Sequence, residues 1–138
     1  MRITTRGRYA LRACIALANT GNIDKPVSIR TLSEIENISP VFLEQIFFKL
    51  RKAGVISSVR GPGGGFKFTK SLEETSLKDI IEASEENVEL TPCTSEKPNC
   101  QRNSECLAHS VWLEATSVLN NYLSKISLKD VLERNITE

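Results

Sequence analysis

The chain has 138 residues, of which 40% are hydrophobic and 25% are charged, and its formal net charge is +1. This composition is typical of one globular domain, or of one domain with an appended element, and excludes fibrous and disordered chains. Its apolar runs are far shorter than the roughly 20 residues that span a bilayer, and Arg6, Arg8 and Arg12 interrupt the N-terminal apolar stretch. We therefore expect a cytoplasmic protein with no membrane partner.

Two helices are predicted at the start of the chain. Residues 6–19 are rich in helix formers and apolar on most faces, which is typical of a helix buried between neighbours. After a turn, Ser28 is the expected N-cap of a short helix, because its hydroxyl can accept a hydrogen bond from the first turn. In that helix the apolar positions Ile29, Leu32 and Ile35 recur every three residues and should face the core.

A third helix has the clearest start signal. Ser39 can cap it, and Pro40 suits the first helical position, where a missing N–H group costs nothing. Its core-facing positions follow the i, i+3, i+4, i+7 pattern and are Leu43, Ile46, Phe47 and Leu50. Its opposite face carries Val41, Glu44, Gln45, Phe48 and Lys52. Because a short turn around Asn37 joins this helix to the preceding one, the pair is a helix-turn-helix candidate.

The period of the sequence changes after Gly54. Residues 55–59 are largely β-branched, and residues 66–69 alternate apolar and polar side chains, which predicts two short strands. Between them, residues 60–65 have the sequence Arg-Gly-Pro-Gly-Gly-Gly, which contains four of the 7 glycines of the chain. The pattern predicts a β-hairpin whose glycine-rich tip lets the backbone approach a ligand closely.

The second half of the chain predicts three further helices and one long loop. Ser76 can cap a short helix, residues 107–126 are helical with a broad apolar side, and a last short helix begins at Ser127. Residues 87–105 lose all periodicity and form the loop. The expected fold is mostly α with a small β-hairpin wing, that is, a winged helix-turn-helix domain followed by a long C-terminal helix.

Charge is divided unevenly between the two halves of the chain. Residues 1–70 hold 12 of the 18 basic residues and 4 of the 17 acidic ones, so this half alone is expected to meet a polyanion. In the third helix, Glu44 and Gln45 could bond to the edges of DNA bases. Lys49 and Arg51, near the end of that helix, could hold phosphates.

Simpler explanations exist for the third helix and for the glycine-rich segment. The helix could be an ordinary solvated amphipathic helix, and the segment could be a plain flexible turn. The segment could also be a phosphate loop of a nucleotide-binding enzyme, but the Lys-Ser/Thr ending and the strand-then-helix context are missing. Arg60 beside a slim loop favours instead an arginine that enters a DNA minor groove.

The third helix and the hairpin carry a family resemblance. The segments FLEQIFFKLRKAG at 42–54 and SVRGPGGGF at 58–66 strongly resemble the Rrf-two family of bacterial winged-helix transcription regulators, and the opening segments MRIT and GRYA are similar to that family too. The resemblance implies a homodimer that binds a partly palindromic operator in double-stranded DNA, with the 39–53 helix in the major groove and Arg60 in the minor groove. The residues then expected at the DNA are Arg2, Ser39, Val41, Phe42, Glu44, Gln45, Lys49, Arg51, Arg60, Gly61, Pro62 and Gly63.

Three cysteines and the single histidine of the chain gather in or beside the predicted loop. They are Cys93, Cys100, Cys106 and His109. In a reducing compartment, clustered thiols favour a metal site over structural disulfides. Zinc accepts such a set, although its structural sites usually contain a closer pair of cysteines, whereas the wider intervals here suit an iron–sulfur cluster. Free, redox-active thiols are the third alternative, and the spacing alone does not choose among the three.

The family resemblance favours the cluster. One subgroup of the family, the iron–sulfur cluster regulators, has three cysteines and a histidine in this region, and the four residues fall on that pattern. This implies a [2Fe–2S] cluster whose presence changes DNA binding at cluster-assembly or related genes. Related nitric-oxide-sensing members lack the histidine and carry a [4Fe–4S] cluster. Cys14 matches no ligand position and is expected to be buried in its helix.

The long helix at 107–126 carries more apolar surface than one small domain needs. Trp112, Leu119 and Ile126 recur every seven residues, as do Ala115 and Tyr122, which suits packing against a partner helix. Burial of this surface within a single chain is the alternative. Because the loop leads directly into this helix, metal binding should order the loop and bias the geometry of a dimer. The expected parts of the chain are therefore a winged helix-turn-helix DNA-binding region at 1–86, a cluster-binding loop at 87–109, and a dimerisation helix with a short C-terminal helix at 110–138.

Two other functional classes are compatible with the metal-ligand set. A cluster carrier or a metal-handling enzyme would use it without DNA, but no nucleophile–base pair and no paired carboxylates support catalysis, so we expect no enzyme activity. A zinc-stabilised DNA-binding protein would contain the site without sensing anything.

Overall fold

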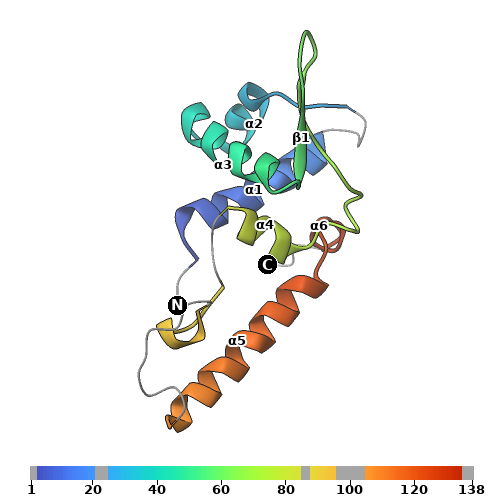
Figure 1. The fold of residues 1–138 in the computed structure, drawn as a ribbon. Helices are drawn as coiled ribbons and strands as arrows, with labels where there is room; N and C mark the ends of the chain where they lie inside the picture. Colours follow the sequence, from blue (N-terminus) through green and yellow to red (C-terminus); the bar gives the residue numbers. More distant parts are fainter. Residues whose placement is uncertain (1–2, 21–24, 85–87, 96–104, 135–138) are drawn as a thin grey trace.

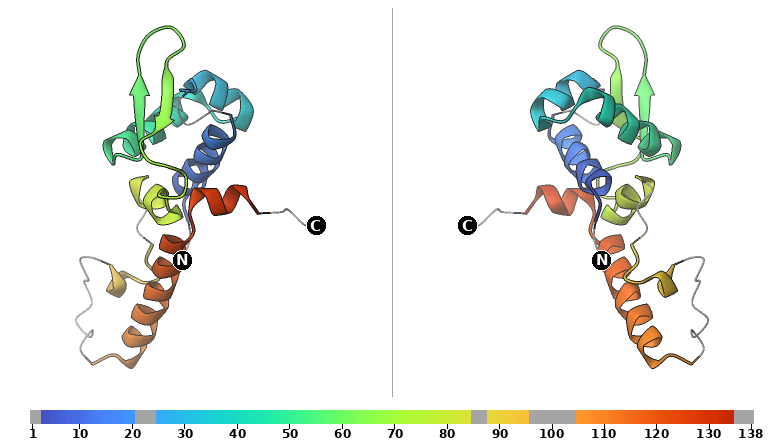
Figure 2. Two further views of the ribbon diagram at one scale, coloured as in Figure 1. Left: turned by 90° about the vertical axis from the view of Figure 1, so that its right-hand side faces the viewer. Right: turned by 90° about the vertical axis from the view of Figure 1, so that its left-hand side faces the viewer.

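The computed structural model describes residues 3–20, 25–84, 88–95 and 105–134 (Figure 1). The elements in chain order are α1 (Thr5–Thr20), α2 (Ile29–Glu36), α3 (Pro40–Lys52), β1 (Ile56–Val59), β2 (Gly65–Phe68), α4 (Leu77–Ala83), the 3₁₀ turn η1 (Pro92–Thr94), α5 (Leu107–Lys125) and α6 (Leu128–Leu132). A helical body carries the β-hairpin at one end, and α5 extends away from the other end (Figures 1 and 2). The expected mostly helical chain with a small hairpin is therefore confirmed.

Helix α1 lies at the centre of the helical body. Its buried positions are mostly small and are Gly7, Ala10, Ala13, Cys14, Ala16 and Leu17. Small side chains let neighbouring helices approach closely, and α1 contacts α2, α3, α4 and α6. The predicted buried helix is thus confirmed.

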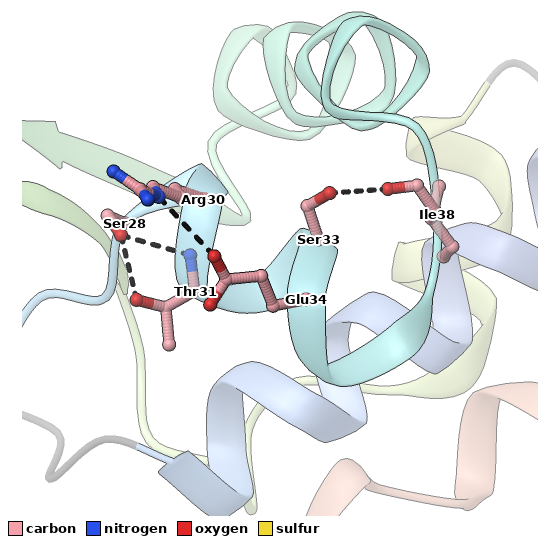
Figure 3. Close-up of polar contacts among 6 residues, drawn as sticks. All are labelled: Ser28, Arg30, Thr31, Ser33, Glu34 and Ile38. Atoms are coloured by element: carbon pink, nitrogen blue, oxygen red, sulfur yellow. Dashed lines mark hydrogen bonds and ion pairs between the residues drawn. The ribbon is translucent and has the colours of Figure 1, made fainter.

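The turn between α2 and α3 is fixed by hydrogen bonds (Figure 3). Ser28 caps α2 as predicted, because its hydroxyl accepts a 3.2 Å hydrogen bond from the Thr31 N–H group. Asn37 ends α2 in the left-handed conformation, with φ of 54°. The Ser33 hydroxyl then donates to the Ile38 carbonyl at 2.6 Å. The left-handed Asn37 and the Ser33–Ile38 hydrogen bond hold the turn, and with it the two helices, in one relative orientation.

The predicted faces of these two helices are confirmed except at Ile35, and the predicted cap of α3 lacks its side-chain hydrogen bond. The core-facing residues of α3 are buried as expected and are Leu43, Ile46, Phe47 and Leu50. Ile35, by contrast, is 52% exposed, because two steps of three residues turn a side chain about 120° around a helix. Ser39 occupies the predicted N-cap position of α3, yet its side chain makes no capping hydrogen bond.

Strand β2 is paired on both of its sides. It pairs antiparallel with β1 over its whole length. On its other side, Val27 and Phe66 exchange two backbone hydrogen bonds of 2.9 and 2.8 Å. Gly65 is required at this junction, since a Cβ atom there would lie 2.3 Å from the Val27 carbonyl oxygen.

Helices α4 and α6 join the second half of the chain to the body. Each begins with the tetrapeptide Ser-Leu-Lys-Asp, whose serine and aspartate form a capping box. The two starts lie side by side, because the Leu77 N–H donates to the Ile126 carbonyl at 2.9 Å and the Leu128 N–H to the Thr75 carbonyl at 2.8 Å. Leu128 is fully buried in the core. This backbone bridge therefore fixes the point at which α5 leaves the body.

Helix α5 has little of its surface buried. Thr116 is its one buried residue. Its large exposed apolar side chains are Leu107, Val111, Trp112, Leu113, Val118 and Tyr122. The predicted helix is confirmed to within one residue, and its apolar side is open within the described chain. None of the described helices, α5 included, is long and apolar enough to cross a membrane.

A network of side chains connects α1 with α2 and α3. The rings of Tyr9 and Phe42 meet edge to face, with their centroids 5.7 Å apart. The Arg12 guanidinium lies 5.1 Å from the centroid of the same Tyr9 ring. It also donates to Glu36 at the end of α2, at 2.9 Å to the carboxylate and at 2.9 Å to the backbone carbonyl. The network therefore sets how α2 and α3 sit on α1.

We predict that Gly65→Ala lowers the free energy of unfolding by about 2–4 kcal/mol, because φ of +154° disfavours an L side chain and the added Cβ atom would collide with the Val27 carbonyl. Gly63→Ala is the matched control. Its φ of +75° is also unfavourable, but no atom lies within 4 Å of its added Cβ, so we expect a loss of about 1 kcal/mol. Urea unfolding followed by circular dichroism measures both losses. Equal losses would contradict the role of the Val27–Phe66 pairing.

We predict that Arg12→Leu lowers the free energy of unfolding by about 1–2 kcal/mol, because it leaves the Glu36 side chain, which is only 22% exposed, without its partner. The control is Arg30→Leu in the Arg30–Glu34 pair, whose side chains are 90% and 70% exposed; its loss should be about 0.5 kcal/mol or less. Double-mutant cycles with Glu36→Leu and Glu34→Leu give the two coupling energies. A coupling no larger for Arg12–Glu36 than for the surface pair would refute the prediction.

Candidate functional site

The exposed face of α3 carries side chains predicted to meet DNA bases. Packing of its opposite face into the core leaves Val41, Glu44, Gln45 and Phe48 exposed. Ser39, just before the helix, is exposed as well. The fold therefore gathers hydrogen-bonding and apolar groups on one open side of a helix, and an α-helix is an element that a DNA major groove admits.

Basic side chains gather at the C-terminal end of α3, where the helix dipole favours positive charge. Lys49, Arg51 and Lys52 all lie in its last turn. The Arg51 guanidinium lies 5.6 Å from the centroid of the Phe48 ring, and its Nη1 donates to the Ser58 hydroxyl of β1 at 3.5 Å. These contacts place the Arg51 charge at the junction of α3 and the hairpin.

The hairpin tip places Arg60 beside a backbone that has almost no side chains. Arg60, Gly61, Pro62 and Gly63 are all exposed. The Gly64 N–H donates to the Gly61 carbonyl at 2.9 Å and closes the turn. Gly61 and Gly63 have φ of 98° and 75°, and added Cβ atoms would meet nothing within 4 Å, so the tip is thin and open. The hairpin projects from the same end of the body as α2 and α3 (Figure 2).

Phe42 differs from the other predicted DNA residues because its ring packs inward. It is half-buried and meets the Tyr9 ring edge to face. Its supporting residues Tyr9 and Arg12 were not expected to have a role at this surface, although Tyr9 lies in a segment that resembles the family. Arg2, also expected at the DNA, lies outside the described residues.

Cys93 lies in η1, which packs against α5 (Figure 2). Its Sγ atom is 3.0 Å from the Thr91 hydroxyl oxygen. Cys93 belongs to the described segment 88–95. Asn120 holds the start of this segment on α5, because its Nδ2 donates to the Val88 and Thr116 carbonyls, both at 3.0 Å. The long helix is therefore the support on which the first of the predicted ligands rests. The only sequence signal for Asn120 is an amide in a largely apolar helix.

Cys106 and His109 lie together at the start of α5. Cys106 is the exposed N-cap residue, and the His109 N–H donates to its carbonyl at 3.2 Å, so the two residues are one helical turn apart. The His109 Nδ1 atom is buried and has no hydrogen-bond partner among the residues that the structure describes. An unpaired buried polar atom costs free energy, and a metal ion would satisfy this one. The imidazole therefore fits the predicted role of a metal ligand.

The described residues do not form a complete metal site by themselves. Among them, no three His, Cys, Asp or Glu side chains lie close enough to hold an ion. Cys100 lies outside the described residues, so the convergence of all four predicted ligands stays a prediction. The four predicted ligands nonetheless suit an iron–sulfur cluster or zinc, because thiolate and imidazole bind both.

Cys14 is set apart from the other cysteines by its burial. It is fully buried in α1, and burial raises the pKa of its thiol to about 12. The thiol is thus protonated at neutral pH and is a poor metal ligand, since metals bind the thiolate. The expectation of a buried cysteine in this helix is confirmed.

Sequence comparison identifies the family. The profile of the Rrf2 (Rrf-two) family, described as an iron-dependent transcriptional regulator, matches residues 3–134. The chain is 37% identical to the HTH-type transcriptional regulator IscR of Vibrio campbellii, over 98% of this chain and 79% of that protein. It is 38% identical to IscR of Vibrio cholerae, over 98% of this chain and 77% of that protein.

Solved structures of related regulators share the fold. Staphylococcus aureus CymR in its oxidised form is 32% identical, with a TM-score of 0.75 over 99% of this chain and 100% of that one. T. potens IscR is 29% identical, with a TM-score of 0.76 over 96% of this chain and 87% of that one. The predicted winged helix-turn-helix fold is confirmed by these likenesses, and the IscR relatives found by sequence are named transcriptional regulators. The chain therefore belongs to the Rrf2 family of winged-helix, DNA-binding transcriptional regulators.

Proposed function

We propose that this regulator acts in the cytoplasm as a homodimer and senses a [2Fe–2S] cluster, whose occupancy alters its preference among operators at cluster-assembly or related genes. The proposal rests on the buried His109 Nδ1, which has no partner within the described parts of the chain and lies one helical turn from Cys106, where it could act as a cluster ligand. The iron-dependent description of the family and the relatives named IscR support the same function.

In the proposed complex, α3 lies in the major groove. The beginning of a recognition helix meets the base edges, so Ser39 and Val41 approach the bases first. Glu44 accepts a hydrogen bond from a cytosine N4 amino group, and Gln45 bonds to adenine. Arg51, held at the junction with β1, contacts a phosphate and fixes the register of the helix on the duplex.

The hairpin tip contacts the minor groove beside the α3 site. Arg60 enters that groove, where the negative potential of a narrow A·T-rich segment attracts its charge. Gly61, Pro62 and Gly63 keep the tip thin enough to follow it. Lys49 holds a phosphate near the end of α3.

Cys93, Cys100 and Cys106 would supply thiolates to the cluster, and His109 would supply its Nδ1 atom. A bound [2Fe–2S] cluster supplies a redox-active group whose occupancy follows the availability of iron and sulfide. The chain contributes the connection to DNA binding. Cys106 and His109 belong to the start of α5, while Cys93 lies on a segment packed against that helix. Shared coordination would therefore tie η1 to the start of α5.

The proposed dimer buries the open apolar side of α5. Val111, Val118 and Tyr122 follow each other at seven and four residues, so they share one side of the helix. Each of these side chains is more than half exposed. Packing them against a second copy removes this apolar surface from water and pairs two recognition surfaces for a palindromic operator. The region at 110–138 is thus the dimerisation unit, and 1–86 is the DNA-binding unit.

We predict that protein purified without oxygen is coloured, contains about two iron atoms per chain and loses both properties in His109→Ala or Cys106→Ala variants. Cys14→Ala is the matched control and should keep colour and iron, because Cys14 is buried away from the ligands. Absorption spectra with iron, sulfide and zinc analysis measure the outcome. Colourless protein with one zinc ion per chain would contradict this proposal and would favour a zinc-stabilised regulator. Unchanged operator affinity after cluster removal at fixed salt would remove the sensing role.

We predict that Val118→Glu in α5 converts the dimer into monomers and weakens operator binding at least tenfold, since a charge buried between two helices has no partner and each half-site is then bound singly. Ser124→Glu adds the same charge on a different side of α5, where Ser124 is exposed, and should leave the dimer intact. Sedimentation equilibrium gives the association state. A Val118→Glu protein that remains dimeric would exclude α5 as the interface.

A further inference from the structure

Two large apolar side chains stand on the otherwise polar exposed face of α3. Val41 is 65% exposed and Phe48 is 56% exposed. Single exposed apolar residues are ordinary on protein surfaces. These two, however, lie seven residues apart, so they point within about 20° of each other around the helix. Glu44 and Gln45 lie between them, and the basic last turn of α3 follows. They therefore belong to the surface proposed to face DNA.

The major groove offers one apolar group to such side chains. Among the four base pairs, only those containing thymine present a methyl group there, and apolar side chains recognise that methyl by direct contact. We propose that α3 selects its operator by contacting the C5-methyl groups of two thymines through Val41 and Phe48. The inference rests on the proposed placement of α3 in the major groove and adds a rule of sequence specificity to it.

The helix geometry sets the spacing of the two thymines. Seven residues rise roughly 10.5 Å along an α-helix, and base pairs are stacked about 3.4 Å apart. A helix that follows the groove therefore contacts methyl groups about three base pairs apart. Glu44 and Gln45 meet the hydrogen-bonding edges of the base pairs between them.

Phe48 is held in place by its neighbour. The Arg51 guanidinium lies 5.6 Å from its ring centroid and is itself bonded to Ser58. This contact favours one position of the ring before DNA binds, so less side-chain entropy is lost when the ring meets the base. Because Phe48 also supports Arg51, its removal should weaken phosphate contacts on every sequence equally. For each variant we therefore compare the affinity for a thymine duplex with the affinity for the duplex in which that thymine is replaced by deoxyuridine. The ratio of the two affinities is free of the common effect.

The test uses the full-length chain and a duplex selected from a randomised library. In the selected operator, each thymine is replaced singly by deoxyuridine, which lacks only the C5-methyl group. We expect two sensitive positions per half-site, about three base pairs apart, each weakening binding about fourfold, the effect of one buried methyl group. In Val41→Ala the ratio of thymine to deoxyuridine affinity should fall to about one at one of the two positions. In Phe48→Ser this ratio should fall at the other position, whereas Phe48→Leu should retain the ratio of the unmodified protein there.

Ile35→Ala is the matched control, because Ile35 is a 52% exposed apolar residue on α2 rather than α3. It should leave both deoxyuridine ratios unchanged. Absence of any sensitive thymine, or full sensitivity at both positions in Val41→Ala and Phe48→Ser, would overturn the inference while leaving DNA binding by α3 intact. Failure to select any duplex would instead overturn the placement of α3 on DNA, and the inference with it.

Discussion

The direction in which α5 leaves the body depends on a backbone bridge of two hydrogen bonds. One joins Leu77 to Ile126 and the other joins Leu128 to Thr75. Because Leu128 is fully buried, the chain cannot shift at this point without opening the core. The two capping boxes then start α4 and α6 on either side of the bridge. α5 is thus held firmly at one end, while the described residues cover little of the rest of it.

Local signals were sufficient to predict much of this fold. The core-facing residues of α3 repeat with the helical period, and the glycine-rich tip of the hairpin follows a change to a period of two. The Arg12–Glu36 ion pair could not be predicted in this way, because its partners are 24 residues apart in the sequence and meet only in the folded chain. The repeated tetrapeptide Ser-Leu-Lys-Asp was a usable signal for the α4–α6 junction, although it does not show that the two helices start side by side.

For the candidate site, the sequence predicted which residues lie there better than it predicted their burial and their packing partners. The exposed positions of α3 follow from periodicity, whereas the inward packing of Phe42 depends on a ring from another helix. Likewise, the spacing of Cys106 and His109 predicts a shared helical turn. It does not predict that His109 Nδ1 is buried without a partner among the described residues, because the burial of an atom depends on contacts made only in the folded chain.

The sensing function that we propose requires a change at one end of α5 to produce a change at the other. A 19-residue helix is about 28 Å long, so tilting it by about 5° at the bridge displaces its far end by about 2.5 Å. In a dimer joined through α5, the same tilt changes the distance between two recognition helices, which must match half-sites about 34–36 Å apart. A ligand shifts such an equilibrium only through contacts that differ between the two states. In the proposed site, coordination shared by α5 and η1, which packs on it, would provide that difference, because its bonds form only when both are correctly placed.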